Sequence, residues 1–202
     1  MPQPLSAAEK LKVNEIFYSV QGEGKYAGAA AVFVRLAGCT AGCEWCDTKY
    51  AAKTNFLLTP ARILAAVKKY PARRVVLTGG EPCEQNIEPL IKLLQKNGCE
   101  IHLETNGSRD INTAHIFCVT VSPKKNALES MLKKSDVIKL VVDGKTTKSK
   151  ILKYLEYINK KTSFFIQPEG NKKENLAKCL QIIKQNPRIR LSVQLHKLIN
   201  IK

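Results

Sequence analysis

Three cysteines within eight residues carry the strongest chemical signal in the sequence: Cys39, Cys43 and Cys46. Gly38 and Gly42 allow the chain around them to curl, so the three thiolates can converge on one metal centre. A structural zinc site takes four ligands, and an iron–sulfur cluster is also normally held by four cysteines. No fourth ligand of suitable spacing follows. The motif therefore predicts a metal centre with an open coordination position, which is a catalytic arrangement, and structural zinc is the weaker alternative.

Other polar motifs follow strands that are predicted from short runs of β-branched residues. The predicted strands are 31–36, 74–77, 100–103, 116–121, 137–142, 163–166 and 191–194. The cysteine loop follows the first strand, and five motifs follow later ones: Thr78-Gly-Gly-Glu-Pro82, Glu104-Thr-Asn-Gly107, Ser122-Pro-Lys124, Gln167-Pro168 and His196. The carboxyl ends of parallel strands meet at one rim, where α/β barrels place their active sites. The six motifs therefore predict one shared cleft.

Helical patterns separate several of these strands. Thr59 followed by proline predicts a helix that begins there and runs to about residue 70. Apolar residues at helical spacing predict a second helix over 87–97. Asn171 and Glu174 resemble a capping box at the start of a third helix. Alternating strands and helices favour a parallel α/β sheet or barrel, formed by one domain over residues 1–202. That length is below the roughly 250 residues of a full eight-unit barrel.

The composition is strongly basic, with 33 Lys and Arg against 17 Asp and Glu and a formal net charge of +16. The basic residues are spread along the chain and do not alternate with aromatic ones, so solvated helix faces explain them better than nucleic-acid binding does. Attraction of an acidic electron-donor protein also fits. No apolar run approaches the roughly 18 residues of a transmembrane helix. The N-terminal residues lack the apolar core of a secretory signal, which predicts a cytoplasmic protein.

The cysteine spacing, Cys-x3-Cys-x2-Cys directly after a strand, resembles the signature of the radical S-adenosylmethionine superfamily. The resemblance implies a [4Fe–4S] cluster whose open iron binds S-adenosylmethionine and splits it into a radical. It also implies an incomplete TIM-like barrel of mostly parallel strands. The positions that it assigns to the cofactors are Trp45, Cys46, Asp47, Gly79, Gly80, Glu81, Ser122, Pro123, Lys124, Gln167, Pro168, Glu169 and Gly170.

Longer segments resemble one family of that superfamily, the 7-carboxy-7-deazaguanine synthases of queuosine biosynthesis. They include EIFYSVQGEG at 15–24, AVFVRLAGC at 31–39 and LSVQLHKLINI at 191–201. The resemblance implies a ring contraction of 6-carboxy-5,6,7,8-tetrahydropterin to 7-carboxy-7-deazaguanine with loss of ammonia. The sequence departs from the family in two ways. The cysteine loop is compact where some members carry an insertion, and Lys202 stands where the family often has proline, at a carboxylate that the resemblance places near the pterin.

The family resemblance also implies roles for individual residues beside the three cysteines. Arg35 would bind the substrate carboxylate, a task suited to a guanidinium, and Glu23 would act in catalysis beside it. Thr48 would join a Mg²⁺ ion held by oxygen ligands. The positions that would contact the substrate are Val20, Gln21, Gly22, Glu23, Arg35, Thr78, His196 and Lys202. Similar proteins are homodimers reduced by a flavodoxin-like or other electron donor, and neither a membrane nor a nucleic acid is expected as a partner.

Two alternatives remain at this point. One is a different radical S-adenosylmethionine enzyme, such as a glycyl-radical activase, which would need a groove for a protein loop. The segments QGEG at 21–24 and LHKLINI at 195–201 do not predict such a groove. The other alternative is a zinc-stabilised basic module that binds RNA.

Overall fold

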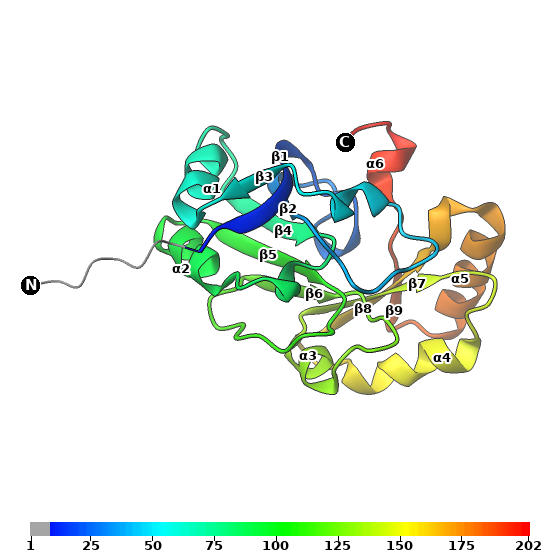
Figure 1. The fold of residues 1–202 in the computed structure, drawn as a ribbon. Coiled ribbons are helices and arrows are strands. Elements are labelled where there is room, and N and C mark those ends of the chain that lie inside the picture. Colours follow the sequence, from blue (N-terminus) through cyan, green and yellow to red (C-terminus); the bar gives the residue numbers. More distant parts are fainter. Residues whose placement is uncertain (1–8) are drawn as a thin grey trace, which may run out of the picture.

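One nine-stranded sheet runs through the computed structural model, which describes residues 9–202 (Figure 1). Its strands lie in the order β3-β1-β2-β4-β5-β6-β7-β8-β9. All pairs from β2 onward are parallel, whereas β1 pairs antiparallel with both β2 and β3. The strands are β1 (Leu11–Val20), β2 (Ala30–Leu36), β3 (Phe56–Leu58), β4 (Arg74–Gly79), β5 (Glu100–Thr105), β6 (Cys118–Val121), β7 (Val137–Val142), β8 (Ser163–Pro168) and β9 (Ile189–Leu191).

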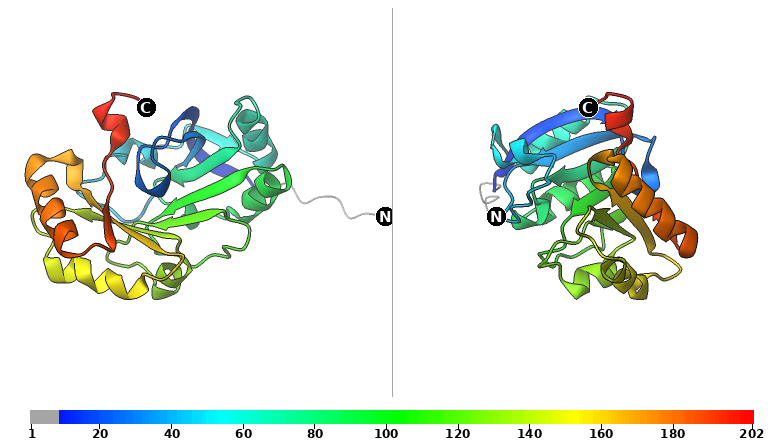
Figure 2. Two further views of the ribbon diagram at one scale, coloured as in Figure 1. Left: turned by 180° about the vertical axis from the view of Figure 1, so that it is seen from behind. Right: turned by 90° about the vertical axis from the view of Figure 1, so that its right-hand side faces the viewer.

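The sheet curves into an open barrel with helices on its convex face (Figure 2). Over residues 9–202, no strand pairing joins the outer strands β3 and β9, so the barrel is incomplete. This confirms the predicted fold class, an incomplete barrel of mostly parallel strands. The helices are α1 (Pro60–Val67), α2 (Glu88–Lys96), α3 (Glu129–Lys134), α4 (Lys148–Leu152), α5 (Lys173–Gln185) and α6 (Leu195–Leu198). Short 3₁₀ segments are η1 (Gly24–Tyr26), η2 (Lys49–Ala52), η3 (Pro82–Glu84), η4 (Lys153–Tyr157) and η5 (Glu169–Asn171).

Two element predictions need correction. The last strand covers Ile189–Leu191 rather than 191–194, because Gln194 leaves the sheet to reach other side chains. The capping box at α5 is absent: the helix begins after Lys172 without a side-chain cap. The side chain of Asn171 instead bonds the main chain of Gln194, donating from Nδ2 to O and accepting from N, both at 3.1 Å. The predicted cap at Thr59 is confirmed, since its Oγ1 accepts from the Arg62 amide.

The two faces of the sheet have different cores. The convex face packs under the helices in one large apolar cluster. The concave face carries a smaller apolar floor that includes Phe33, Val76 and Val137. Side chains two residues further along a strand point to the same face. On β2, β4 and β7 the next inward residue is polar: Arg35, Thr78 and Lys139. The barrel interior therefore has an apolar base and a polar layer at the carboxyl ends of the strands.

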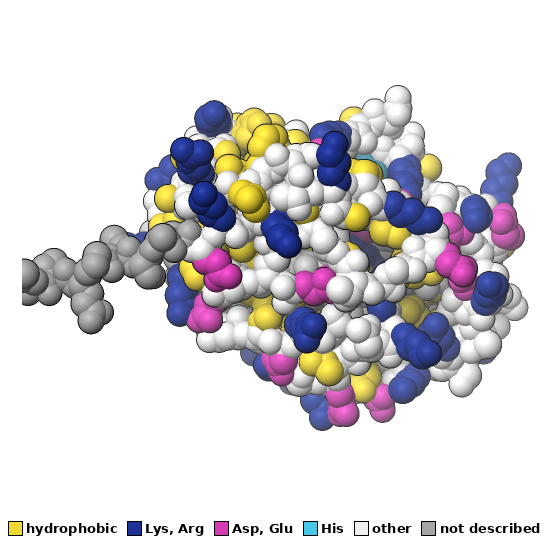
Figure 3. All heavy atoms as spheres, in the orientation of Figure 1, with side chains coloured by type: hydrophobic (Ala, Val, Ile, Leu, Met, Phe, Trp, Pro, Cys, Tyr) yellow, Lys and Arg dark blue, Asp and Glu magenta, His cyan; other side chains and the backbone are white. Residues whose placement is uncertain are grey.

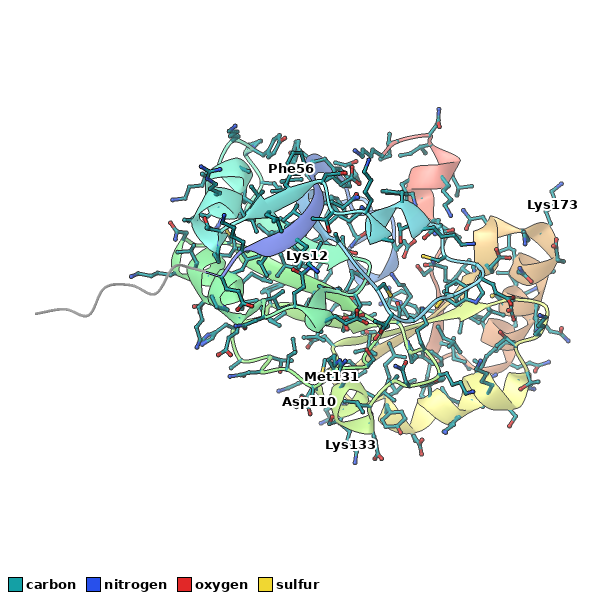
Figure 4. All side chains as sticks on the ribbon, in the orientation of Figure 1. Lys12, Phe56, Asp110, Met131, Lys133 and Lys173 are labelled. Atoms are coloured by element: carbon teal, nitrogen blue, oxygen red, sulfur yellow. The ribbon has the colours of Figure 1, made fainter. Side chains whose placement is uncertain are left out.

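Basic residues do not gather on the face shown in Figure 3, where they lie among acidic and apolar side chains. Lys133 on α3 and Lys173 on α5 point outward at separate places (Figure 4). This arrangement is in line with solvated helix surfaces. No helix within residues 9–202 is long and apolar enough to cross a membrane. The prediction made from the N-terminal residues 1–12 falls mostly on residues 1–8, which lie outside the described part of the chain.

Candidate active site

A cavity of about 720 Å³ opens at the carboxyl ends of the strands, within the usual range of ligand pockets. Most of the predicted site residues line it, although they come from distant parts of the sequence. Those on its wall are Val20, Gln21, Gly22, Glu23, Arg35, Cys39, Cys43, Trp45, Cys46, Asp47, Thr48, Thr78, Gly79, Gly80, Glu81, Ser122, Lys124, His196 and Lys202. The predicted shared cleft is thus present as a single cavity.

Five of the predicted cofactor positions do not line this cavity: Pro123, Gln167, Pro168, Glu169 and Gly170. Gln167 is buried at the end of β8, where its Oε1 accepts a hydrogen bond from Ser192 Oγ at 2.9 Å. Glu169 and Gly170 belong to η5, beyond the strand end, and Glu169 pairs with the exposed Lys172 at 2.6 Å. Their predicted contact with the cofactor remains a prediction.

The cysteine loop crosses the cavity mouth and is fixed to three parts of the fold. The Gly38 amide donates to Ala51 O in η2 at 3.0 Å, and the Glu81 amide donates to Gly38 O at 2.8 Å. Thr40 donates to Glu84 Oε1 from its amide at 3.1 Å and from its hydroxyl at 2.5 Å. These bonds fix the start of the loop and tie it to η2, which follows the loop, while the cysteine side chains stay exposed or half-buried.

The donor set fits an iron–sulfur cluster with one open iron. Cys39, Cys43 and Cys46 line one cavity, and within residues 9–202 no fourth cysteine lines it. Partial desolvation and the nearby Glu84 and Glu81 carboxylates raise the pKa of the Cys39 thiol, so the positive charge of a bound metal would be needed to keep it as a thiolate.

The two glycines of the Thr78-to-Pro82 motif are required because neighbouring backbone segments leave no room for a side chain. A Cβ at Gly79 would lie 2.0 Å from Leu36 O, and one at Gly80 would lie 2.0 Å from Gly38 O and 2.8 Å from Cys39 Cβ. Gly79 also has a φ of 138°, a conformation that glycine favours. The family resemblance assigns both glycines to the cofactors. In the structure, the end of β2 also approaches Gly79 closely, and the start of the cysteine loop approaches Gly80.

Gly80→Ala should therefore displace the cysteine loop. Overpacking against a backbone oxygen costs about 1–3 kcal/mol or more, and we expect a lower free energy of unfolding together with reduced iron binding. Urea denaturation and iron per chain after anaerobic reconstitution would measure the two effects. Gly144→Ala is the matched control, because a Cβ there meets nothing within 4 Å. Full iron loading of Gly80→Ala would contradict this role.

Glu81 anchors the end of β4 to the end of β5. Its side chain is almost completely buried and accepts three hydrogen bonds, from Thr105 Oγ1 at 2.6 Å, from the Asn106 amide at 2.6 Å and from the Cys83 amide at 3.0 Å. Breaking such a buried network leaves unpaired donors, which is costly. Glu81 therefore holds the strand ends that form one side of the cavity.

Arg35 lies between two aromatic rings on the cavity wall. Its guanidinium carbon is 5.6 Å from the centre of the Phe17 ring and 5.5 Å from that of Tyr50. Its Nε donates to Glu15 Oε1 at 2.8 Å, and Glu15 also pairs with the Lys202 ammonium. Burial opposes ionisation of Glu15, but Lys202 and Arg35 outweigh it and lower the pKa of this carboxyl. Arg35 and Lys202 share the Glu15 carboxylate here, so this end of the cavity presents a guanidinium that can bind an anionic ligand group.

A second set of charged side chains lies deeper in the cavity, and part of it was missed by sequence reasoning. The Lys139 ammonium on β7 pairs with Glu23 Oε2 at 2.5 Å and with Glu104 Oε2 at 3.0 Å. Gln194 Nε2 donates to Glu23 Oε1 at 2.9 Å and to Asp47 Oδ2 at 2.6 Å. Lys139 was missed because a lysine within a strand carries no local signal. Its inward position two residues after the apolar Val137 could have identified it.

The C-terminal segment closes one side of the cavity. The Leu195 amide donates to Gly22 O at 2.9 Å, and Ser19 Oγ donates to Lys202 O at 2.6 Å. A Cβ at Gly22 would lie 2.1 Å from His196 Nδ1, so the imidazole packs directly on the bare backbone of Gly22. Burial lowers the pKa of His196, which favours the neutral imidazole.

Glu23, Asp47 and His196 bring one ligand atom each to within 4.8 Å of one another. Both carboxylates already have cationic partners: Lys139 contacts Glu23, and Lys197 donates to Asp47 Oδ2 at 2.9 Å. Cations at these distances disfavour a further metal ion, and Gln194 Nε2 instead bridges the two carboxylates.

The amino-acid sequence is similar to those of known radical S-adenosylmethionine enzymes. The model of the Radical SAM superfamily matches residues 34–185. The 7-carboxy-7-deazaguanine synthase of Bacteroides thetaiotaomicron is 40% identical over 191 residues, which cover 95% of this chain and 98% of that protein. The synthase of Escherichia coli (strain K12) is 34% identical over 220 residues, with coverage of 94% and 98%.

The fold is also similar to that of a solved structure. The crystal structure of QueE from Escherichia coli superposes with a TM-score of 0.78 at 32% identity, covering 93% of this chain and 95% of that chain. The chain belongs to the 7-carboxy-7-deazaguanine synthase family of radical S-adenosylmethionine enzymes.

Proposed function

We propose that the cavity binds 6-carboxy-5,6,7,8-tetrahydropterin beside a [4Fe–4S] cluster and S-adenosylmethionine, and that the single radical S-adenosylmethionine domain 1–202 converts it to 7-carboxy-7-deazaguanine for queuosine biosynthesis. The observation that carries the proposal is that Arg35 and the three-cysteine loop line the same cavity. The guanidinium of Arg35 suits a carboxylate, and an open iron suits a cofactor that chelates it. A substrate bound to Arg35 would therefore lie next to the cofactor.

On the cofactor side, Cys39, Cys43 and Cys46 would hold the cluster. When bound, the cluster and S-adenosylmethionine supply the radical that starts the reaction. Trp45 and Lys124 would flank the cofactor, and the Lys124 ammonium already lies 4.4 Å from the centre of the Trp45 ring. Both residues line the cavity, so their side chains can exclude water from that part of it.

On the substrate side, the chain offers hydrogen-bond acceptors to a ligand rich in N–H groups. The carboxylate of Glu23 and the side chains of Gln21, Thr78 and His196 line this part of the cavity. Burial opposes ionisation of Glu23, but Lys139 and Gln194 outweigh it and lower the pKa of its carboxyl, so it is a pure acceptor at neutral pH. These residues would orient the pterin ring while Arg35 holds its carboxylate.

A magnesium ion would be held at Thr48. The hydroxyl of this residue lies on the cavity wall, 3.5 Å from Cys46 Sγ. Oxygen ligation with few protein groups is what Mg²⁺ accepts when the substrate supplies the other ligands.

Thr48→Ala should weaken the response of turnover to Mg²⁺. With one protein ligand removed, we expect the Mg²⁺ concentration for half-maximal activity to rise about tenfold, since one hydrogen-bonding or ligand group contributes on the order of 1.4 kcal/mol. Thr48→Ser keeps the hydroxyl and serves as the control. Identical metal titrations for wild type and Thr48→Ala would count against the assignment.

Two partners are part of the proposal. A flavodoxin-like or other acidic electron donor would approach the cysteine loop, because Cys39 is exposed and the chain carries a net charge of +16. The active protein would be a homodimer in the cytoplasm. Sedimentation of the reconstituted protein tests the homodimer, and a monomer at micromolar concentration would refute it.

The decisive experiment is anaerobic turnover. The protein is reconstituted with iron and sulfide and incubated with 6-carboxytetrahydropterin, S-adenosylmethionine, Mg²⁺ and dithionite. We expect a visible band that dithionite bleaches and a product with the mass of 7-carboxy-7-deazaguanine. Cleavage of S-adenosylmethionine with the pterin unchanged would refute the substrate assignment, and a colourless protein with stoichiometric zinc would refute the cluster.

A further inference from the structure

Lys139 is a buried cation in the active-site wall. Only 6% of it is exposed, and its side chain reaches from β7 into the cavity. Its ammonium pairs with two carboxylates that belong to distant elements: Glu23 follows β1, and Glu104 lies on β5. A buried charge requires partners, and a lysine held by two carboxylates is a costly arrangement for a wall that could have been apolar.

The two carboxylates next to Lys139 are both directed at the cavity. Besides Lys139, Glu23 has Gln194 as a donor, and Glu104 Oε1 accepts from Gln21 Nε2 at 3.4 Å. An ionised carboxylate has about four acceptor positions, so each retains capacity for N–H donors of a ligand. The pair therefore offers a ligand two acceptors.

Without Lys139, the carboxylates would face each other in a poorly solvated space. Like charges at short range force one carboxyl to take up a proton. Burial already raises the pKa of Glu104 while Lys139 opposes the rise, so Glu104 is the group that would protonate. Burial also acts against the Lys139 charge, but Glu104 and Glu23 outweigh it and raise the pKa of the ammonium above its ordinary value.

We propose that Lys139 is a positioning residue for substrate binding. Its ammonium fixes the carboxylates of Glu23 and Glu104 in place and keeps both ionised, so that both accept hydrogen bonds from N–H groups of the bound pterin. The inference rests on the proposed function, since it concerns the same ligand. Other charged groups around this cluster are Lys124 after β6, Asp47 of the cysteine loop, and His196 and Lys197 of α6. The Lys139 ammonium contacts both carboxylates, so Lys139 is the group that couples them.

The test is the affinity for 6-carboxytetrahydropterin between pH 6.5 and 8.5. Anaerobic calorimetry without S-adenosylmethionine or reductant measures binding alone. For the wild type we expect the dissociation constant to change less than threefold over this range. Lys139→Met should bind tenfold or more weakly at pH 6.5 than at pH 8.5, because a carboxyl that protonates as the pH falls stops accepting. Lys139→Arg should restore most of the flat profile.

Controls separate this role from a structural one. Lys178→Met removes a lysine that donates to Asp143 O and Gly144 O outside the cavity, and its binding profile should stay flat. If Lys139→Met does not fold, Lys139→Gln keeps a hydrogen-bond donor and carries the same expectation. A folded Lys139→Met or Lys139→Gln protein whose affinity does not change with pH overturns the proposal. A tenfold loss of wild-type affinity between pH 8.5 and pH 6.5 overturns it as well. A wild type that does not bind the pterin at all refutes the proposed function instead.

Discussion

Replacing Cys43 by alanine is expected to abolish both the visible band of the reconstituted protein and its turnover. Cys43 lies half-buried in a loop whose two other cysteines line the same cavity, so its loss leaves two ligands where three are the minimum for the proposed cluster. We expect turnover to fall below detection and iron per chain to fall sharply. Absorbance spectra and iron assays after reconstitution measure this.

The fold should survive that substitution. The loop is held through main-chain bonds and through Thr40, not through the Cys43 thiol, so the free energy of unfolding of the metal-free protein should change by about 0.5 kcal/mol or less. Cys99→Ala is the matched control, because Cys99 is also half-buried but lies outside the cavity. It should keep its iron and its turnover. A Cys43→Ala protein with the full visible band would contradict the ligand assignment.

Arg35→Ala should lose substrate binding while the cluster stays intact. Removing one partner of a desolvated charge pair costs about 2–5 kcal/mol, which corresponds to a rise in KM of roughly 30-fold or more. The guanidinium contacts Glu15 and the rings of Phe17 and Tyr50, not the cysteines, so the visible band should be unchanged. Steady-state kinetics and absorbance spectra measure the two expectations.

Arg190→Ala provides a control with similar packing. Arg190 lies 4.9 Å from the centre of the Phe165 ring but does not line the cavity. Its loss should leave KM within about twofold of the wild type, as expected for a surface substitution outside the site. An Arg35→Ala enzyme with unaltered turnover at subsaturating pterin would remove Arg35 from the substrate pocket.

The sequence allowed prediction of those parts of the site whose signals are local. The cysteine loop, the glycine motif and the strand ends each have characteristic neighbours, and the parallel sheet brings them to one rim. Similarity along the whole chain then decides between the synthase family and the alternatives of an activase or an RNA-binding zinc module.

Long-range pairing was beyond local reasoning. β1 was not predicted as a strand, because its pairing with β2 shifts register between Val13 and Glu15 and interrupts the alternation of buried residues. Asn171 has the residue type and spacing of a helix cap, yet its side chain is taken by Gln194, 23 residues away. The roles of Lys139 and Gln194 depend on carboxylates that are distant in the sequence and that the fold brings into contact with them.

The contacts that complete the cavity span almost the whole chain. Gln194 lies 171 residues from Glu23, and Lys202 lies 183 residues from Ser19. Because synthesis proceeds from the N-terminus, the cysteine loop leaves the ribosome long before the segment that walls the cavity beside it. A nascent chain that stops before residue 190 would carry the three thiols in an unfinished pocket open to oxidants. Delivery of iron and sulfide is therefore best timed after translation, when residues 192–202 have docked.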